Sequence, residues 1–429
     1  MSPQSVAQYL PADCEPFDVV VFDEASQIPS ADAVGALARG RRAVVVGDPK
    51  QLPPTDFFSK KVEADEDSEE WDDEPLESIL DDCLAAGFPR VSLGWHYRSR
   101  SESLISFSNG RYYGGGLVTF PSPDAADMAV ELVKVDGVYD RGRGGTRTNL
   151  PEAEAVVAEV VRLLKSAESR MPGFSVGVVT FNAPQQELVE NLLERERLAD
   201  PTLERYFDEA LEEPVIVKNL ENIQGDERGH VLFSVGYGPD AQGKMTLNFG
   251  PLNRPGGERR LNVAITRARL GVKIFASFAP DVIPEGDRTP RGVADLRDFM
   301  RYAARGGAAS AQPGGSRASS EFAAYVAEGL RSRGWKVDCR LGASGFRMDM
   351  AVADPADPSR YLAGIECDGE SFRDARTAVD REILRGEVLA GLGWKIIRVW
   401  SMEWWKQSGV AEARSRMDML DTELRRLLR

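Results

Sequence analysis

Two polar turns near the start of the chain carry residues that could act on a nucleotide. Asp23 and Glu24 follow the apolar run Val19–Phe22, and the turn Gly47–Gln51 follows the apolar run Ala43–Val46. Both runs have the length and β-branched content of fully buried parallel strands, so we expect the two turns to share one sheet edge. Paired carboxylates there can hold magnesium on a phosphate and orient the attacking water. The alternative is a solvated Asp-Glu pair at the start of a helix.

The sequence motifs around these acids resemble those of a helicase family. DEASQ, residues 23–27, and GDPKQLPP, residues 47–54, are similar to motifs II and III of superfamily 1 helicases, in the branch of the RNA-surveillance helicases. The resemblance implies RecA-like parallel-sheet motor domains that use ATP. It makes Asp23, Glu24 and Gln51 catalytic, with Asp23 as a magnesium ligand.

A first arginine that could reach a phosphate is Arg98. It stands between Arg90–Leu93, an expected strand, and a helix that we expect to begin with Ser101 as its cap. A surface ion pair is the alternative role. HYRS, residues 96–99, resembles motif IV of the same helicases, which implies that Arg98 touches the terminal phosphate.

A second such arginine is Arg267, in ERRLNVAITRAR, residues 258–269. The spacing of the apolar residues predicts a helix on which Arg267 lies off the buried face. A guanidinium presented to a cleft between domains can stabilise charge on a transferred phosphoryl group, whereas the alternative is a solvated basic face. LNVAITRAR resembles motif VI and implies that Arg267 is the arginine finger.

A polar loop, NIQGDE at residues 222–227, follows the short apolar run Val215–Val217. Alone it predicts only a connection between strands. Its resemblance to motif V implies that Gln224 and Gly225 face the nucleotide crevice and couple it to nucleic acid. The same resemblance implies that Glu227 contacts the ribose.

A glycine-rich phosphate loop is not found ahead of Asp23, which only 22 residues precede. Gly238–Lys244 has the spacing of such a loop, but Met245 stands where a hydroxyl ligand of magnesium is required. We therefore expect this polypeptide to bind triphosphate weakly. We interpret it as a helicase truncated at its N-terminus, with a missing motor half or a partner subunit supplying the loop.

A second set of three acids lies in the C-terminal part, at expected strand segments. Glu366 and Asp368 are two residues apart and would share one face of a strand, next to Asp349 on a neighbouring strand. Three carboxylates there could hold magnesium, generate a hydroxide and clamp a phosphodiester. Acids that keep an edge strand soluble are the alternative.

The surrounding stretches resemble the PD-(D/E)xK restriction-endonuclease-like nucleases, in the branch of the very-short-patch-repair endonucleases. They are SGFRMDMAV, GIECDGESF and DREILRGEVLAGLGWKIIRVWS, residues 344–352, 364–372 and 380–401. The resemblance implies that Asp349, Glu366 and Asp368 bind the metal, although the class more often has lysine at the position of Asp368. Further matches are Glu321 on the first helix and the pair Asp380 and Arg381. Phe372-Arg373 stands where the branch has an aromatic-His pair.

The predicted fold class is therefore α/β, with two parallel-sheet motor domains, the first partial, and a restriction-endonuclease-like domain. We place the first motor domain at residues 1–100, with an acidic loop at 60–82, and the second at 101–305. A linker rich in Gly, Ala and Ser occupies 306–318, and the nuclease domain occupies 319–429.

Composition excludes several classes of protein. The net charge of −15 arises largely between Glu63 and Asp82, which hold twelve acids and no base and predict a solvated loop. The four cysteines form no CxxC pair and there are two histidines, which argues against a disulfide framework, a zinc site or a histidine metal centre. No run is long enough for a membrane span and the start lacks a signal peptide, so we expect a cytoplasmic protein without membrane contact.

Our interpretation is a helicase-nuclease that acts on DNA, with RNA as the alternative. We expect Mg²⁺ as its cofactor, Mn²⁺ as a substitute, and ATP where a phosphate loop is supplied. The rival interpretation is a non-catalytic nucleic-acid-binding or assembly protein with degenerate sites. The missing phosphate loop favours the rival for the motor half, and the three acids favour catalysis for the nuclease half.

Overall fold

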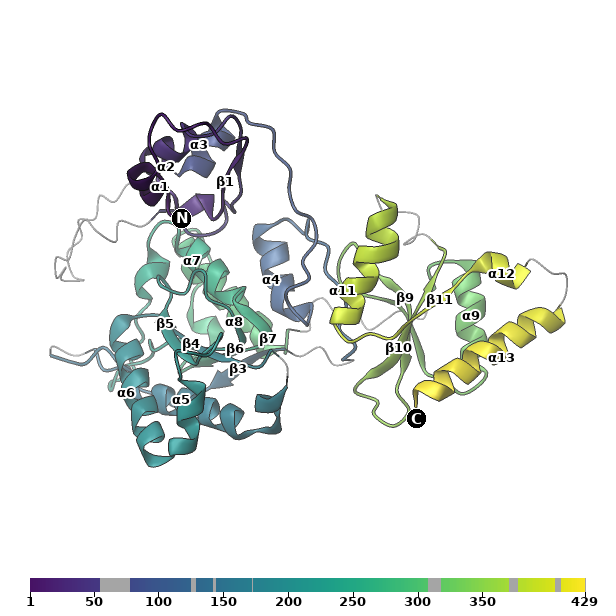
Figure 1. Cartoon of the computed structure of the whole chain (residues 1–429). Helices are drawn as coiled ribbons and strands as arrows, with labels where there is room; N and C mark the ends of the chain where they lie inside the picture. The colour runs from purple at the N-terminus through teal and green to yellow at the C-terminus, as the bar shows by residue number, and fades with distance from the viewer. Residues whose placement is uncertain are drawn as a thin grey trace.

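The computed structural model describes residues 1–54, 78–124, 129–141, 144–171, 173–307, 318–369, 377–405 and 410–428. Three separate sheets follow one another along these residues, with two, five and four strands. They form a small N-terminal unit, a larger motor unit and a C-terminal unit that lies to one side (Figure 1). Most of the acidic loop and of the linker, together with Phe372 and Arg373, lies outside the described residues.

The N-terminal unit holds the two predicted strands as a parallel pair. β1 (Val20–Phe22) and β2 (Ala43–Val45) pair with Phe22 opposite Val45. Its helices are α1 (Pro3–Tyr9), α2 (Ser30–Leu37) and α3 (Ile79–Ala85). The prediction of fully buried strands is wrong, because Val21 is 62% exposed. Phe22 packs with side chains of α2 and α3, whereas Val21 points to the opposite face of the two-stranded sheet.

The motor unit is built on a five-stranded parallel sheet, which confirms the predicted fold class. The strand order is β3-β7-β6-β4-β5. Its strands are β3 (Val130–Lys134), β4 (Val176–Thr180), β5 (Ile216–Asn219), β6 (Arg228–Ser234) and β7 (Ala268–Ala276).

Helices cover both faces of this sheet, as a parallel sheet with buried strands requires. The motor helices are α4 (Ser103–Tyr112), α5 (Leu150–Lys165), α6 (Ala183–Ala199), α7 (Gly257–Ile265) and α8 (Arg291–Ala304). Val178 packs in one core with α5 and α6, and its neighbour Val179 packs in the other with α7 and α8. Short 3₁₀ turns are η1 (Ala25–Gln27), η2 (Ala167–Arg170), η3 (Pro201–Tyr206), η4 (Gly250–Asn253) and η5 (Pro280–Val282).

Two predictions about the segment around Arg98 are wrong. Residues 90–93 form no strand, and Val91 is 92% exposed, because no neighbouring strand pairs with them. The following helix begins at Ser103, so Ser101 is not its cap. Glu102, directly before the helix, is buried and accepts hydrogen bonds from Ala343 N at 3.0 Å and from the Thr119 hydroxyl.

The C-terminal unit is a mixed four-stranded sheet in the order β11-β10-β9-β8. Its strands are β8 (Val337–Leu341), β9 (Met348–Ala353), β10 (Tyr361–Cys367) and β11 (Ile396–Val399). The helices are α9 (Glu321–Arg331), α11 (Arg385–Gly391), α12 (Ser401–Trp405) and α13 (Val410–Leu427). A π-helical turn, Asp380–Leu384, leads directly into α11. Ser320 caps α9 by accepting from Ala323 N.

Residues 117–124, which we call the docking segment, join the motor unit to the C-terminal unit. Phe120 packs against Phe346, with ring centroids 5.0 Å apart, and against Trp95 at 5.3 Å. Trp394 Nε1 donates to Pro121 O at 2.7 Å. The two units are therefore held together by a packed apolar contact as well as by the chain connection. None of the described helices is both long and apolar enough to cross a membrane.

Candidate nucleotide and nuclease sites

The first candidate site lies between the N-terminal unit and the motor unit. Gln224 Nε2 is 3.4 Å from Glu24 Oε2 and 3.4 Å from Gln51 Oε1. Asn262 donates to Lys50 O at 3.0 Å. Three stretches that are distant in sequence, DEASQ, GDPKQ and NIQGDE, are thus brought together as the motifs imply.

The acidic turn itself has an unusual backbone. Glu24 is a non-glycine residue with φ of 51°, in the left-handed region. Asp23 Oδ1 accepts from Glu24 N at 2.9 Å, and both side chains are exposed. Strained backbone of this kind is concentrated at functional sites, and here it falls in the turn that carries both acids.

Both predicted arginines carry charge close to this site. Arg98, half-exposed, forms an ion pair with Glu227 at 3.0 Å. Arg267 is 4% exposed and donates from Nε to Val263 O at 2.9 Å. Burial lowers the pKa of Arg267, and the positive charge of Arg98 lowers it further. The negative charges of Glu227 and Glu24 act in the opposite direction. These charges therefore lie within electrostatic reach of one another.

The prediction that Arg267 lies on the exposed face of a helix is wrong. α7 ends at Ile265, and Arg267 lies in the turn before β7. The predicted helix is too long because LNVAITRAR has helical spacing up to the point where the chain enters the sheet.

The residues at this site fit the outer part of a nucleoside triphosphate. Asp23, Arg98 and Arg267 are groups that bind magnesium or phosphate oxygens. Gln224 Oε1 and Asn262 Oδ1 are buried and accept no hydrogen bond within the described part of the chain. Gly225 has φ of 88°, which only glycine adopts without strain, and turns the loop next to Gln224.

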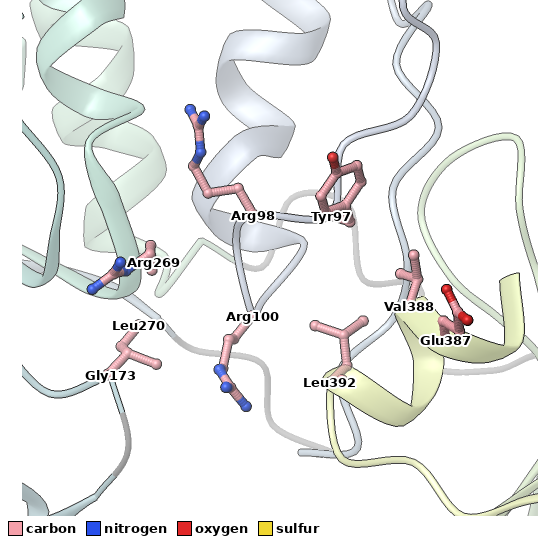
Figure 2. A pocket seen from close by; sticks show the side chains of 10 residues that line it. Tyr97, Arg98, Arg100, Gly173, Arg269, Leu270, Glu387, Val388 and Leu392 are labelled. Carbon is pink, nitrogen blue, oxygen red and sulfur yellow. The ribbon is translucent and has the colours of Figure 1, made fainter. Parts of the chain in front are cut away.

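A pocket of about 420 Å³ lies near Arg98, between the motor unit and α11. Arg98, Arg100 and Arg269 line one side, and Glu387 and Val388 line the other. Figure 2 shows the three guanidinium groups pointing away from one another, so they do not converge on one anion.

The second candidate site is built on the sheet of the C-terminal unit. Asp349 on β9 and Glu366 on β10 each lie one residue beyond the antiparallel pair Met350 and Ile365. Asp349 is 1% exposed and accepts from the Ser319 hydroxyl at 2.5 Å and from Cys367 N at 2.8 Å. Burial raises its pKa. The sheet therefore places two carboxylates together.

Glu366 is partly buried among cations. Arg398 on β11 is its direct neighbour in the parallel register, and Arg398 Nε lies 3.7 Å from Glu366 Oε2. Burial raises the pKa of Glu366, whereas Arg385 and Arg398 lower it and Asp349 raises it further. The site thus holds two acids and two arginines.

The third predicted ligand is engaged elsewhere. Asp368 lies one residue past β10 and accepts from Ser401 N at 3.0 Å and from the Ser401 hydroxyl at 2.5 Å. No group of three or more His, Cys, Asp or Glu side chains in the described residues is arranged to hold a metal ion. Glu321 is exposed at the start of α9 and forms no hydrogen bond or ion pair with these acids.

Asp349 and Glu366 alone still fit magnesium, because the ion is commonly held by one or two carboxylates and several waters. Arg385 and Arg398 are the site residues that sequence reasoning did not single out. The pairing of β11 with β10 is the signal that could have found Arg398, since it places Arg398 opposite Glu366.

The protein-family models that match the chain follow one another in the same order as its three structural units. Two AAA-domain models match residues 4–59 and 76–278, and a restriction-endonuclease model, REase_MTES_1575, matches residues 322–417. An uncharacterized ATP-dependent helicase of Mycoplasma pneumoniae, the MG140 homolog, is 36% identical over 287 residues, 64% of this chain and 24% of the relative. The mouse probable helicase senataxin is 26% identical over 270 residues, 61% of this chain and 9% of the relative.

The chain thus spans about a quarter of the length of the first of these relatives. Among solved structures, arterivirus nonstructural protein 10, a helicase in complex with DNA, matches with a TM-score of 0.29 and 14% identity. That match covers 62% of this chain and 42% of the viral protein.

Proposed function

The chain carries AAA domains of the helicase type followed by a restriction-endonuclease-like domain, and we propose that it belongs to a helicase-nuclease acting on DNA. In this proposal the C-terminal unit is a magnesium-dependent phosphodiester hydrolase. The N-terminal and motor units form an ATP-dependent translocase module that needs a phosphate loop from outside these 429 residues.

The observation that carries the nuclease proposal is the pairing of Asp349 with Glu366 on neighbouring strands. Asp349 is oriented by Ser319 and by Cys367 N, so its carboxylate keeps one position. These two residues would hold the magnesium ion, which supplies an activated water and polarises the phosphoryl group when bound. In this proposal Asp368 would become a third metal ligand only if its hydrogen bonds from Ser401 were broken.

In the motor units, Asp23 would hold magnesium on the nucleotide and Glu24 would orient the water. Arg98 and Arg267 lie within electrostatic reach of Glu24 and Glu227, where they would stabilise charge on the terminal phosphate. Gln224 contacts Glu24 and Gln51, so it connects the nucleotide-binding residues of the two units.

The experiment is cleavage of labelled single-stranded, duplex and forked DNA by the full chain with magnesium or manganese, without ATP. Asp349→Asn and Glu366→Gln should each abolish cleavage, because each removes one charge from the metal site. Asp357→Asn is the matched control, since Asp357 is an exposed acid of the same domain that accepts only within its own turn, from Ser359.

Metal-dependent cleavage that both site variants lose and the control retains would support the nuclease. Cleavage that survives in Asp349→Asn and Glu366→Gln would overturn this assignment. Saturable DNA binding without cleavage of any substrate would favour the non-catalytic binding or assembly protein. An RNA arm with the same sequence tests whether DNA is the substrate.

A further inference from the structure

The pocket between the motor unit and the C-terminal unit has no role in the proposed function. It has a volume of about 420 Å³, and we call it the inter-unit groove. Its lining side chains come from the segment before α4, from the start of β7 and from α11. They include Tyr97 and Arg100, Arg269 and Leu270, and Glu387 and Leu392. The groove therefore exists only where the two units dock.

Arg100 supplies a positive charge that is not neutralised within the described part of the chain. Its side chain is exposed and forms no hydrogen bond or ion pair with another described residue. Its backbone is fixed, because Arg100 N donates to Arg269 O at 2.9 Å. Figure 2 shows the Arg100 side chain between those of Leu270 and Leu392, which belong to opposite walls of the groove. The groove thus presents a guanidinium whose N–H groups can donate to a ligand.

The other two arginines of the groove have acidic partners. Arg98 pairs with Glu227 at 3.0 Å, on the side of the candidate nucleotide site, and Arg269 pairs with Glu213. Each pair occupies part of a guanidinium, which carries five N–H donors. Because the guanidinium groups point away from one another, they suit phosphates that follow one another along a strand better than a single free phosphate.

An exposed aromatic ring stands beside these cations. Tyr97 is 65% exposed and lines the same groove. Sites for single-stranded nucleic acid combine such a ring with basic side chains, because a base stacks on the ring while the phosphates pair with the cations. The bases of a duplex are already stacked on one another, so a duplex cannot use the ring in this way. The side chains of the groove therefore favour a single strand.

We propose that the inter-unit groove binds single-stranded nucleic acid, with Arg100 and Arg269 on its phosphates and a base stacked on Tyr97. The inference rests on the proposed function, in which the motor unit moves along DNA and the C-terminal unit cleaves it. A strand in the groove would lie between the two units that act on it.

The wall formed by α11 is connected to the candidate nuclease site. The π-helical turn Asp380–Leu384 runs directly into α11. Arg398 donates to Glu382 of this turn at 2.6 Å and lies 3.7 Å from Glu366. The groove and the two acids of the nuclease site are therefore linked through one short stretch of the C-terminal unit.

Glu387 places a charge of opposite sign on the same wall. Its carboxylate is exposed on α11, so it would repel the phosphates of a bound strand. Two variants of one groove should therefore act in opposite directions. Removal of the positive charge of Arg100 should weaken binding, and removal of the negative charge of Glu387 should strengthen it.

The test titrates a labelled single-stranded DNA oligonucleotide with the full chain in EDTA, which withholds the metal needed for cleavage. Fluorescence anisotropy is measured at several salt concentrations. We expect Arg100→Met to bind about tenfold more weakly and the slope of log K against log salt to fall by about one, as for a single phosphate contact. Tyr97→Ala should bind about tenfold more weakly with an unchanged slope, because it removes stacking rather than charge. Glu387→Gln should bind more tightly than wild type.

Arg195→Met and Tyr9→Ala are the matched controls. Arg195 is exposed on α6, on the side of the motor unit away from the C-terminal unit (Figure 1), and Tyr9 is 70% exposed on α1. Both controls should bind as wild type does. The substituted groove residues are exposed, so their variants should fold, and thermal unfolding checks this.

Equal affinities of the groove variants and the controls would overturn the inference, and so would equal binding of a blunt duplex of the same sequence. Groove variants that bind and, with magnesium, cleave as wild type does would overturn it while leaving the proposed nuclease standing. Loss of binding in Arg100→Met and Tyr97→Ala, with no cleavage by wild type in magnesium, would support the groove and count against the proposed nuclease.

Discussion

Glu152 is a fully buried carboxylate inside the motor unit, and all of its hydrogen-bond partners are neutral. It accepts from Gly236 N at 2.6 Å, Ser234 Oγ at 2.9 Å and Ser277 Oγ at 3.1 Å. Burial raises its pKa from 4.5 to about 7 despite these donors. Its ionisation therefore opposes folding within the ordinary pH range.

The sign of the resulting pH dependence follows from proton binding. Between pH 4.5 and about 7 the folded state binds more protons at Glu152 than the unfolded state. Its contribution to stability is therefore full at low pH and is lost as the pH rises. We expect wild type to lose about 3 kcal/mol relative to Glu152→Gln between about pH 4.5 and pH 8.

Urea unfolding of both proteins across this pH range, followed by far-UV circular dichroism, measures the difference. Comparison with Glu152→Gln cancels the other titrating groups, which the two proteins share. Stability curves that stay parallel across the range would show that Glu152 remains ionised in the folded state.

Asp368 offers a test that separates a structural acid from a metal ligand. Because it holds Ser401 at the start of α12, we expect Asp368→Asn to lower the free energy of unfolding by about 1 kcal/mol. The affinity of Asp368→Asn for Mn²⁺, measured by calorimetry, should differ less from that of wild type than the affinity of Glu366→Gln does. An equal loss of affinity in both variants would instead make Asp368 a ligand.

At the scale of single residues, the sequence predicts which residues belong to a candidate site better than it predicts what packs around them. The acids Asp349 and Glu366 were found because each interrupts an otherwise apolar strand segment that can be recognised in the sequence. The burial of Arg267 and the contact of Arg398 with Glu366 depend on which elements pack together from distant parts of the chain. The spacing of residues within one segment does not indicate which distant segment packs against it.

Among the elements, the docking segment has a role that can be tested by one truncation. Phe120 is buried between Trp95 of the motor unit and Phe346 of the C-terminal unit. Phe120→Ala should cost about 3 kcal/mol, the usual cost of removing a buried aromatic ring. Hydrogen exchange should then speed up in residues 117–124 and in α11, with little change in β4 and β6.

Tyr97→Ala is the control for this prediction. Tyr97 is an aromatic residue close to Trp95 in sequence, but its side chain is mostly exposed, so its removal should leave exchange unchanged. Uniform acceleration across all units in Phe120→Ala would mean that the segment supports the whole fold rather than the contact between two units.

Elements with a clear pattern of their own can be predicted well, and isolated ones cannot. The helical spacing of apolar residues over 152–165 predicts α5, and the largely apolar run over 361–367 predicts the buried strand β10. Arg90–Leu93 reads as a strand but pairs with nothing. A strand is stabilised by pairing with a neighbouring strand, and the sequence of a short segment does not show whether such a neighbour is present.

For the whole molecule, the order of the units could be inferred from motifs and composition, whereas their docking could not. The contact between Phe120 and Phe346 joins residues that are more than two hundred positions apart. Through this contact the motor segment that carries Arg98 lies against α11, the helix that begins with Arg385. The placement of the C-terminal unit on the motor unit is therefore a property of the assembled chain.

The same whole-chain view predicts weak nucleotide binding by residues 1–429. In the proposed function, Asp23, Arg98 and Arg267 would contact magnesium and the terminal phosphate, whereas the glycine-rich loop and lysine for the inner phosphates would come from outside residues 1–429. Each charge-assisted contact of such a loop contributes about 1.5–3 kcal/mol, so the loss of two or three moves an affinity from about micromolar to about millimolar. Titration of a fluorescent ATP analogue with magnesium should therefore show no saturation below about 1 mM. Saturable micromolar binding that Asp23→Asn abolishes would instead mean that residues within this chain replace the loop.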